Sequence, residues 1–358
     1  MRIRRALAFP YRPAAGQCRP DCVIIRVDTD DGLTGWGEAY GADGMAALTC
    51  RAFDTLIAPR CIGQEVGEDI GLAQTIGAIL HALGGSGPVA FALAGLDVAL
   101  WDLAGKRRGQ PVHALLGAKR AVTLASAVRL DYASLAAGSE PPWTQATLAG
   151  HAGLYLAGAT LSQLQAARRA FPGAALMLQP PRPWRADAFM TRAAALRELA
   201  LAWVEDPLWP LGDHTAQAAL RARAGLRLAG GQLCLSRADA WRQMDAGAID
   251  VLQISPTRLG GLSAAIGLAQ HARSAGVDIA PLALGEGPGY LACLHLATAL
   301  APEALVCVHA PGASPALCGP AAAPGGNGAR APETPGLGAD PDPDLLEAGQ
   351  QRFHEAVA

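Results

Sequence analysis

The stretch RLAGGQLC, residues 227–234, has an uncharged amide at a position where a carboxylate would be better suited to catalysis. An apolar run that ends in two glycines and a polar residue is typical of a buried strand that delivers one functional group to a pocket, and here that group is Gln232. Other polar residues lie near the ends of similar runs and are candidates for an acid/base or ligand-binding site. They are Tyr155, Glu205, Asp206, Arg258, Glu286 and His309.

Eight short apolar runs alternate with stretches of helical periodicity and would position these side chains. Strands that alternate with helices form parallel sheets, and eight of them close into a barrel, so we expect an α/β protein with its functional groups at the carboxyl ends of the strands. The helical stretches include residues 161–171, 189–200, 238–247 and 261–276. The runs are VTLASAV (122–128), GLYLAGA (153–159), AALMLQP (174–180), LAWVEDP (201–207), LRLAGGQ (226–232), DVLQISP (250–256), VDIAPLA (277–283) and ALVCVHA (304–310).

The first third of the chain predicts a separate α+β domain. The β-branched residues 23–27, the turn signal at residues 31–32 and the aromatic run that follows indicate a hairpin at the start of the protein. Residues 45–116 have helical spacing, and Gly109 marks a helix end. Near the C-terminus, residues 311–343 are rich in Pro and Gly and predict a long loop that returns to the first domain. The expected domains are therefore 1–120, 121–320 and 321–358.

The amino-acid composition of the chain limits the classes of molecule that it is expected to bind. The chain has 358 residues, is 51% hydrophobic and 17% charged, and no segment approaches the roughly 20 uninterrupted apolar residues of a membrane span. We therefore expect a soluble, cytoplasmic protein without a secretory signal. A net charge of −2 with no basic block argues against nucleic acid as a partner. A small molecule is therefore the expected partner. The eight cysteines form no paired zinc motif and fit reduced, packed thiols.

Several motifs, in their order along the chain, resemble the mandelate racemase/muconate lactonizing enzyme branch of the enolase superfamily. The resemblance covers nearly the full length. It implies an α+β capping domain over a modified (β/α)7β barrel, and it makes a homo-oligomer plausible. The motifs are GLTGWGEAY (32–40), AGLDVALWDLAGKRRGQPVHALLG (94–117), WVEDPL (203–208), LAGGQ (228–232), TRLGGLSAAIGLAQHARSAGV (257–277) and PGLGADPDPDLL (335–346).

The resemblance also implies a chemistry. In such enzymes three carboxylates at the ends of strands three, four and five hold Mg²⁺, and a Lys, or a His paired with an Asp, removes the proton α to a substrate carboxylate. At the three metal positions this chain has Gln179, Glu205 and Gln232. Because Mg²⁺ is held mostly by charge and an amide offers only a dipole, we expect no tight magnesium site. No cofactor is expected, and Mg²⁺ is implied by the family resemblance only.

The base positions of the family are also changed. Its Lys-x-Lys motif on strand two corresponds to Tyr155 and Ala157, and its Asp and His positions correspond to Ser255 and Leu282. The whole chain has only two lysines, at positions 106 and 119, and both precede all eight barrel runs. No lysine is therefore available as a base in the barrel strands.

Three functional hypotheses remain open, and the third is a purely structural role in a hetero-oligomer with an active paralogue. The first is a homologue that has lost magnesium-dependent proton abstraction and binds a small molecule such as a carboxylic acid, or acts as a regulator. Its ligand-binding residues would be Gln179, Glu205, Gln232, Arg258 and Glu286, and buried Glu205 would have a raised pKa and bond to Gln179 or Gln232. The second is a racemase, cycloisomerase or acid-sugar dehydratase with an atypical site, for which the catalytic candidates are Tyr155, Glu205 and His309.

Three polar residues on apolar helices are predicted to have a structural role. Asp97 and Asp102 lie on the predicted helix of residues 94–108 and are interpreted as polar anchors of that helix. His295, within LACLHLATAL, is interpreted as a core histidine whose hydrogen bonds are satisfied, and not as a ligand.

Overall fold

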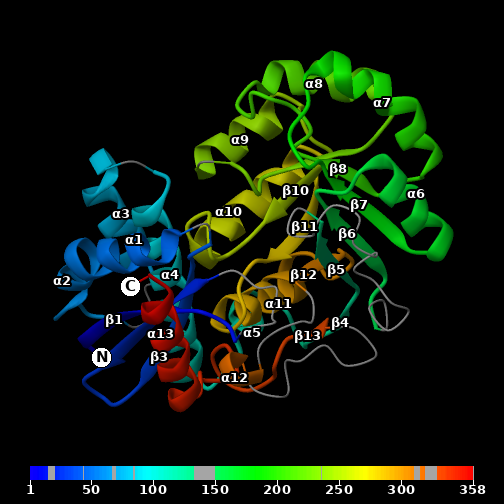
Figure 1. Cartoon of the computed structure of the whole chain (residues 1–358). Helices are drawn as coiled ribbons and strands as arrows, with labels where there is room; N and C mark the ends of the chain where they lie inside the picture. The colour runs from blue at the N-terminus through cyan, green and yellow to red at the C-terminus, as the bar shows by residue number, and fades with distance from the viewer. Residues whose placement is uncertain are drawn as a thin grey trace.

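In the computed structural model an N-terminal α+β domain lies beside a closed barrel of parallel strands (Figure 1). This is the expected fold class, and the expectation is confirmed. The structure describes residues 1–14, 21–42, 44–66, 70–83, 85–132, 150–234, 236–309, 315–318 and 329–357.

The N-terminal domain begins with a three-stranded antiparallel sheet in the order β1 (Ile3–Tyr11), β2 (Cys22–Thr29) and β3 (Thr34–Tyr40). The predicted hairpin is confirmed as β2 and β3. The expectation that this hairpin opens the domain is wrong, because β1 precedes it and pairs with the other edge of β2. Charged residues interrupt the apolar pattern of β1, and the strand is stabilised by its pairing with β2.

Helices cover this sheet on one side. Long helix α4 (Pro88–Arg108) packs against β3 and ends at Gly109, whose positive φ of 63° confirms the predicted helix end. Helix α4 is long and apolar enough to cross a membrane, but 72% of the relevant window is buried inside the protein, as in a core helix. The other helical segments here are α1 (Met45–Ala52), η1 (Phe53–Ile57), α2 (Ala58–Cys61), α3 (Leu72–Ile79), η2 (His81–Leu83) and α5 (Val112–Leu115).

The two aspartates of α4 are buried anchors, as the sequence analysis predicts. Asp97 accepts hydrogen bonds from the Gln74 side chain at 2.9 Å and from the Ser263 backbone N–H at 2.9 Å, so it joins α4 to α3 and to the barrel helix α10. Asp102 accepts from the Trp36 N–H at 2.9 Å and the Leu337 N–H at 2.7 Å. Each carboxylate thus links segments that are far apart in the sequence.

All eight predicted barrel strands are present. Their order around the closed barrel is β10-β11-β12-β5-β6-β7-β8-β9. The first predicted run divides into β4 (Thr123–Leu124), which pairs with β13 (Ala329–Arg330), and the barrel strand β5, which begins only at residue 126. The barrel strands are β5 (Ser126–Asp131), β6 (Gly153–Ala157), β7 (Ala175–Gln179), β8 (Trp203–Glu205), β9 (Leu228–Gly230), β10 (Val251–Ile254), β11 (Asp278–Ala283) and β12 (Val306–His309).

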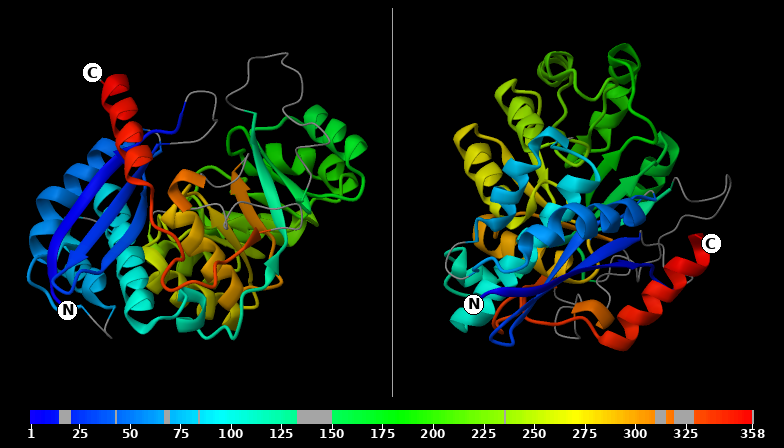
Figure 2. Two further views of the ribbon diagram at one scale, coloured as in Figure 1. Left: turned by 90° about the horizontal axis from the view of Figure 1, so that it is seen from below. Right: turned by 90° about the vertical axis from the view of Figure 1, so that its left-hand side faces the viewer.

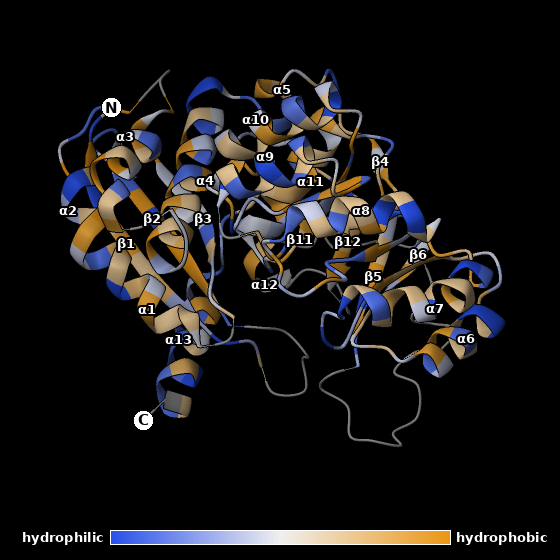
Figure 3. Cartoon of the chain, turned by 90° about the horizontal axis from the view of Figure 1, so that it is seen from above, coloured by the Kyte–Doolittle hydropathy of each residue, from blue (hydrophilic) through white to orange (hydrophobic). Residues whose placement is uncertain are grey.

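Helices surround the barrel, and the hydropathy of each alternates between hydrophilic and hydrophobic bands (Figure 3). The four helical stretches predicted from the sequence are confirmed as α6, α7, α9 and α10. The barrel helices are α6 (Leu161–Ala170), α7 (Ala186–Glu198), α8 (His214–Ala224), α9 (Arg237–Asp245), α10 (Gly261–Ser274) and α11 (Pro288–Leu300).

Helix α11 carries the predicted core histidine. His295 is fully buried, one ring nitrogen lies 3.1 Å from the Leu337 carbonyl, and the other accepts the His113 N–H at 3.1 Å. Burial lowers the pKa of His295 to about 3. The structural interpretation of this residue is confirmed.

The C-terminal segment returns to the N-terminal domain. Helix α13 (Pro343–Val357) packs against β1, and Figure 2 shows it beside the N-terminal sheet. The Arg12 N–H donates to the Gly349 carbonyl at 3.2 Å, and the Arg352 guanidinium donates to the Arg12 carbonyl at 3.1 Å. Within the predicted loop of residues 311–343, the described part contains the short helix α12 (Pro315–Cys318) and strand β13. Parts of that predicted loop lie outside the described residues.

Candidate functional site

The candidate site lies at the carboxyl ends of β5 to β9. Alternate residues of a strand face the same side of a sheet, and one alternate set fills the inside of the barrel with an apolar cluster that includes Ala127, Met177 and Ala229. Polar side chains continue the same alternation at the carboxyl ends. A cavity of about 260 Å³ opens there, lined by Arg129, Asp131, Ala157, Gly158, Gln179, Pro180, Pro181, Pro183, Asp206 and Leu233.

Glu205, the last residue of β8, is the centre of a hydrogen-bonded group. Its side chain is fully buried. One carboxyl oxygen accepts a hydrogen bond from the phenol of Tyr155, and the other accepts from the Gln179 amide nitrogen at 3.3 Å. The predicted contact between Glu205 and Gln179 is therefore confirmed, and both carboxyl oxygens have partners within the protein.

Gln232 joins the group through Tyr155. The phenol oxygen of Tyr155 lies 3.2 Å from the Gln232 amide oxygen. A phenol has a single proton, which it donates to Glu205 when that carboxyl is ionised. When Glu205 is protonated, the carboxyl can donate to the phenol oxygen, and the phenol proton is then free for Gln232. The phenol is therefore the single O–H donor of this group when Glu205 is ionised, and the phenol and the carboxyl both donate when Glu205 is protonated.

Arg129 is the residue of this site that the sequence analysis missed. The first barrel run was predicted to end at residue 128, but β5 continues to residue 131 and carries Arg129 to the barrel mouth. Its guanidinium donates to the Gln179 amide oxygen at 2.8 Å and lies over the Tyr155 ring, 4.7 Å from the centroid. The alternating pattern of SAVRLD, with Ala127 and Arg129 on one face, was the signal that could have found it.

The buried carboxyls of Glu205 and Asp206 have raised pKa values. Burial raises the pKa of Glu205 to about 7, although the hydrogen bond from Tyr155 and the charge of Arg129 act in the opposite direction. Burial and the neighbouring Glu205 charge raise the pKa of Asp206 well above its usual range. Burial, with the same carboxylate, also raises the pKa of the Tyr155 phenol. The predicted upward shift of Glu205 is confirmed.

Two backbone conformations hold the strand ends in place. Asp206 has a φ of 39°, in the left-handed region. Non-glycine residues rarely adopt this conformation, because it costs them roughly 1–2 kcal/mol. Its N–H donates to the Ala229 carbonyl at 3.0 Å, and its carboxyl accepts from the Leu233 N–H at 3.3 Å. Gly231 has a φ of 108°, and a Cβ there would lie 2.4 Å from the Gln253 carbonyl oxygen. The glycine before Gln232 is therefore required by space as well as by backbone angle.

The N-terminal domain reaches the barrel mouth near two further predicted residues. Arg258 lies with its guanidinium 5.1 Å from the Tyr40 ring centroid, a cation–π contact with the capping domain. Glu286 donates its backbone N–H at 2.9 Å to the fully buried carboxylate of Glu38, which also accepts from the Gly289 N–H at 2.9 Å. Glu38, which the sequence analysis did not select, thus holds the segment after β11.

The other predicted positions are accounted for as follows. His309 is the last residue of β12 and pairs in register with Arg129, but its side chain lies outside the described part of the structure. The Ser255 hydroxyl lies 3.0 Å from the Thr257 hydroxyl, and Leu282 belongs to the apolar cluster inside the barrel. Both lysines lie outside the barrel strands, Lys106 in α4 and residue 119 between α5 and β4. The prediction that no barrel strand carries a lysine is confirmed.

The side chains of this site do not match the ligands that Mg²⁺ requires. At the ends of β7, β8 and β9 they provide one carboxylate and two amides, and both oxygens of Glu205 already accept hydrogen bonds. Asp206 directs a carboxyl oxygen to the Leu233 N–H. Among the described residues there is no group of three His, Cys, Asp or Glu side chains that could hold a metal ion.

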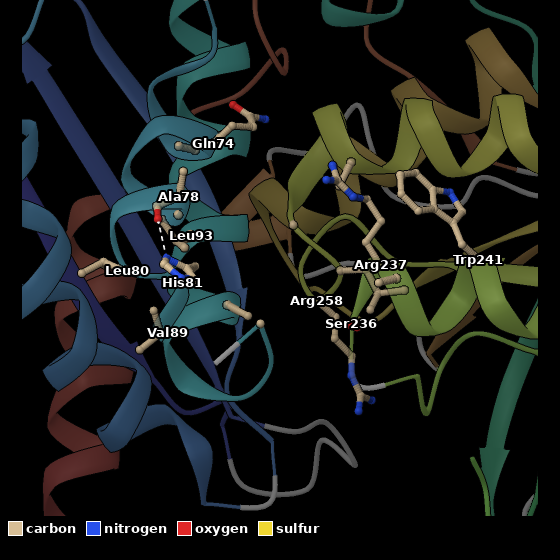
Figure 4. Close-up of a pocket in the computed structure, with 18 residues that line it drawn as sticks. Gln74, Ala78, Leu80, His81, Val89, Leu93, Ser236, Arg237, Trp241 and Arg258 are labelled. Carbon is tan, nitrogen blue, oxygen red and sulfur yellow. Dashed lines mark hydrogen bonds between the residues drawn. The ribbon is translucent and has the colours of Figure 1, made fainter. Parts of the chain in front are cut away.

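A second, larger cavity of about 510 Å³ lies between the two domains. Figure 4 shows Gln74 of α3, His81 of η2 and Leu93 of α4 on one side and Arg237 and Trp241 of α9 on the other. The lining is mainly apolar, and Arg258 contributes to it. Its lining does not include Tyr155, Gln179, Glu205 or Gln232.

Two family models match the chain. Residues 4–117 match the mandelate racemase/muconate lactonizing enzyme N-terminal domain, and residues 115–345 match the enolase C-terminal domain-like family. Together they span the N-terminal domain and the barrel.

Named relatives and a solved structure are similar over most of the chain. A D-galactarolactone cycloisomerase from Agrobacterium fabrum is 28% identical over 78% of this chain and 76% of its own length. A D-galactonate dehydratase from Verminephrobacter eiseniae is 30% identical over 77% of this chain and 75% of its own length. A mandelate racemase/muconate lactonizing protein from Paracoccus denitrificans, crystallised with magnesium, is similar in fold, with a TM-score of 0.82 and 22% identity over 97% of this chain and 98% of that chain.

Proposed function

Since the chain belongs to the mandelate racemase/muconate lactonizing enzyme branch of the enolase superfamily, we propose that it binds a small carboxylic acid at the barrel mouth without Mg²⁺. We propose further that it has lost the magnesium-dependent removal of a proton next to a carboxylate. Such a protein would serve as a small-molecule-binding or regulatory member of the family. The expected homo-oligomer and cytoplasmic location stay predictions.

The observation that carries this proposal is the closed set of hydrogen bonds around Glu205. Tyr155 and Gln179 donate to its two oxygens, so the only carboxylate among the three metal positions faces protein donors. Mg²⁺ sheds its water reluctantly and is held mainly by anionic oxygens. Replacing two of three carboxylates with amides removes charge pairs that are worth roughly 1 to 4 kcal/mol each at contact distance.

A second candidate function is supported by the Tyr155–Glu205 pair. A carboxyl with a pKa of about 7 that accepts a hydrogen bond from a phenol can donate or accept a proton near neutral pH. The chain would then be a racemase, cycloisomerase or acid-sugar dehydratase that works without a metal. The similarity to a named cycloisomerase and a named dehydratase favours this candidate, but a fold alone does not supply an activity.

Calorimetric titration of the chelator-stripped protein with Mg²⁺ and Mn²⁺, read beside its metal content before stripping, tests the first proposal. We expect no binding at millimolar metal. Stoichiometric binding at micromolar affinity would contradict the proposal, because it would require that the carboxamides or other residues hold the ion.

Solvent-deuterium incorporation separates the two candidates. The protein is incubated in D₂O and EDTA with α-hydroxy acids and sugar acids, including D-galactonate, and exchange at the α carbon is followed by NMR. The binding proposal expects no exchange above the background rate. Exchange that disappears in Glu205→Gln would establish metal-free proton transfer and make the second candidate the function.

A further inference from the structure

We propose that Arg129 supplies a fixed positive charge at the barrel mouth and binds the carboxylate of the ligand in the cavity of about 260 Å³. This inference rests on the proposed function and names the group that recognises the ligand. It makes the ligand an anion and predicts that a neutral analogue of the same shape binds poorly.

The guanidinium of Arg129 is held in a defined position before any ligand arrives. One terminal nitrogen donates to the Gln179 amide oxygen at 2.8 Å, and the guanidinium carbon lies 4.7 Å from the Tyr155 ring centroid. The hydrogen bond also orients the Gln179 amide, because its oxygen faces Arg129 and its nitrogen faces Glu205. A donor that is already positioned loses little conformational freedom when a ligand binds.

The other terminal nitrogen of Arg129, Nη1, is available. It is buried and makes no hydrogen bond to any described residue. A buried polar group without a partner is unfavourable by about 1–3 kcal/mol, and by more when it is charged. A guanidinium presents its N–H groups as a fork that matches a carboxylate. A ligand oxygen beside Nη1 would satisfy this donor.

The cavity beside Arg129 suits a small anion. Gln179 and Leu233 line it without charge, Asp131 is an exposed residue at its rim, and Asp206 is buried with its carboxyl turned toward the Leu233 N–H. The volume is below the roughly 300–1,000 Å³ of sites for drug-sized ligands, so the ligand is small.

Matched acids and amides test the inference by calorimetry on the full chain in EDTA. The probes are glycolate against glycolamide and D-galactonate against D-galactonamide, which differ within each pair in charge at one end. The variants are Arg129→Met, which removes the charge, and Arg129→Lys, which keeps it. The control is Arg26→Met, because Arg26 on β2 also lies over an aromatic ring, 5.4 Å from the Trp36 centroid.

We expect at least one acid to bind about tenfold or more tightly than its amide, an energy difference of about 1.4 kcal/mol. That preference should disappear in Arg129→Met, persist in weakened form in Arg129→Lys and be unchanged in Arg26→Met. The inference is overturned if an amide binds as tightly as its acid, if Arg129→Met binds the acids like the wild type, or if neither acid binds at roughly 50 mM. Because the acid–amide comparison uses the wild-type protein, it stands even where a variant fails to fold.

A parallel titration with Mg²⁺ in place of EDTA keeps this inference separate from the proposed function. Arg129-dependent binding that also requires the metal would contradict the metal-free function while leaving the role of Arg129 intact. Metal-free binding that does not distinguish an acid from its amide would contradict the role of Arg129 and leave the metal-free function intact.

Discussion

Tyr155 donates a hydrogen bond to Glu205 across the inside of the barrel, although 50 positions separate the two residues in the sequence. The strands that carry them, β6 and β8, are not neighbours, since β7 lies between them. The phenol therefore reaches the centre of the barrel mouth, where it also lies 3.2 Å from the Gln232 amide oxygen. The amides at positions 179 and 232 and the carboxyl of Glu205 form one polar group with Tyr155 and Arg129.

Tyr155→Phe should lower the free energy of unfolding by about 1–3 kcal/mol, because the buried carboxylate of Glu205 loses its phenol donor. Chemical denaturation measures this change. Tyr290→Phe is the matched control, since the Tyr290 hydroxyl is buried and has no hydrogen-bond partner among the described residues. Removing that hydroxyl should leave stability unchanged or increase it. Equal losses in the two variants would show that the Tyr155 hydroxyl has no special role.

Glu205→Gln should stabilise the protein above pH 7 and have little effect near pH 4. Burial raises the pKa of Glu205 in the folded protein from 4.5 to about 7, so the folded state binds its proton more tightly than the unfolded state does. The contribution of Glu205 to stability therefore falls as pH rises from about 4.5 to 7, by up to about 3 kcal/mol.

Denaturation curves of wild type and Glu205→Gln at a series of pH values measure this difference. Exposed Glu198 on α7 provides the control variant Glu198→Gln, whose curve should follow the wild type at every pH. A stability difference for Glu205→Gln that does not change with pH would contradict the raised pKa.

Restoring carboxylates should create a metal site. We expect the variant Gln179→Asp/Gln232→Glu/Tyr155→Phe to bind Mg²⁺ measurably by calorimetry, because it adds two anionic oxygen ligands and removes the phenol that donates to Glu205. The control variant Gln110→Asp/Gln270→Glu makes the same change of charge at exposed positions. If both variants bind Mg²⁺ equally weakly, the amides are not the reason for weak binding.

Asp102→Ala should lower the free energy of unfolding by about 2–5 kcal/mol, because two buried backbone N–H groups, at roughly 1–3 kcal/mol each, lose their acceptor. Asp102 is fully buried and pairs with Lys106 at 2.7 Å, while its oxygens also accept from two backbone N–H groups. Asp187→Ala is the control, since Asp187 pairs with Arg185 at 3.8 Å and both side chains are more than 80% exposed. The free energy of unfolding of Asp187→Ala should fall by no more than about 1 kcal/mol. Urea denaturation of the two variants provides the comparison.

Much of the fold could be predicted from local patterns. The eight apolar runs became eight barrel strands because each is long enough for a strand, apolar enough to be buried on both faces and separated from the next by a connecting segment. Gly109 ended α4 for a local reason, since glycine adopts the left-handed conformation readily. Strand β1 could not be found in this way, because its stability depends on pairing with β2.

Part of the candidate site was predictable and part was not. Gln179, Glu205 and Gln232 follow apolar runs, so their place at the strand ends could be read from the chain. The predicted end of the first run excluded Arg129, because strand ends are the least certain feature of a local pattern. Glu38 was hidden for another reason, since the segment that its carboxylate holds begins 248 positions later.

The sequence by itself determined which residue types are available at the barrel mouth: one carboxylate and two amides where three carboxylates are implied by the family, and no lysine in the barrel strands. These facts need no coordinates, because they depend only on residue identity and on strand periodicity. Only the tertiary structure decided how those side chains are satisfied. Closure of the barrel brings Arg129, Tyr155 and Glu205 from three strands within contact distance, and the low polarity of that interior raises the pKa of Glu205. Both effects arise from burial and proximity, which a linear sequence does not contain.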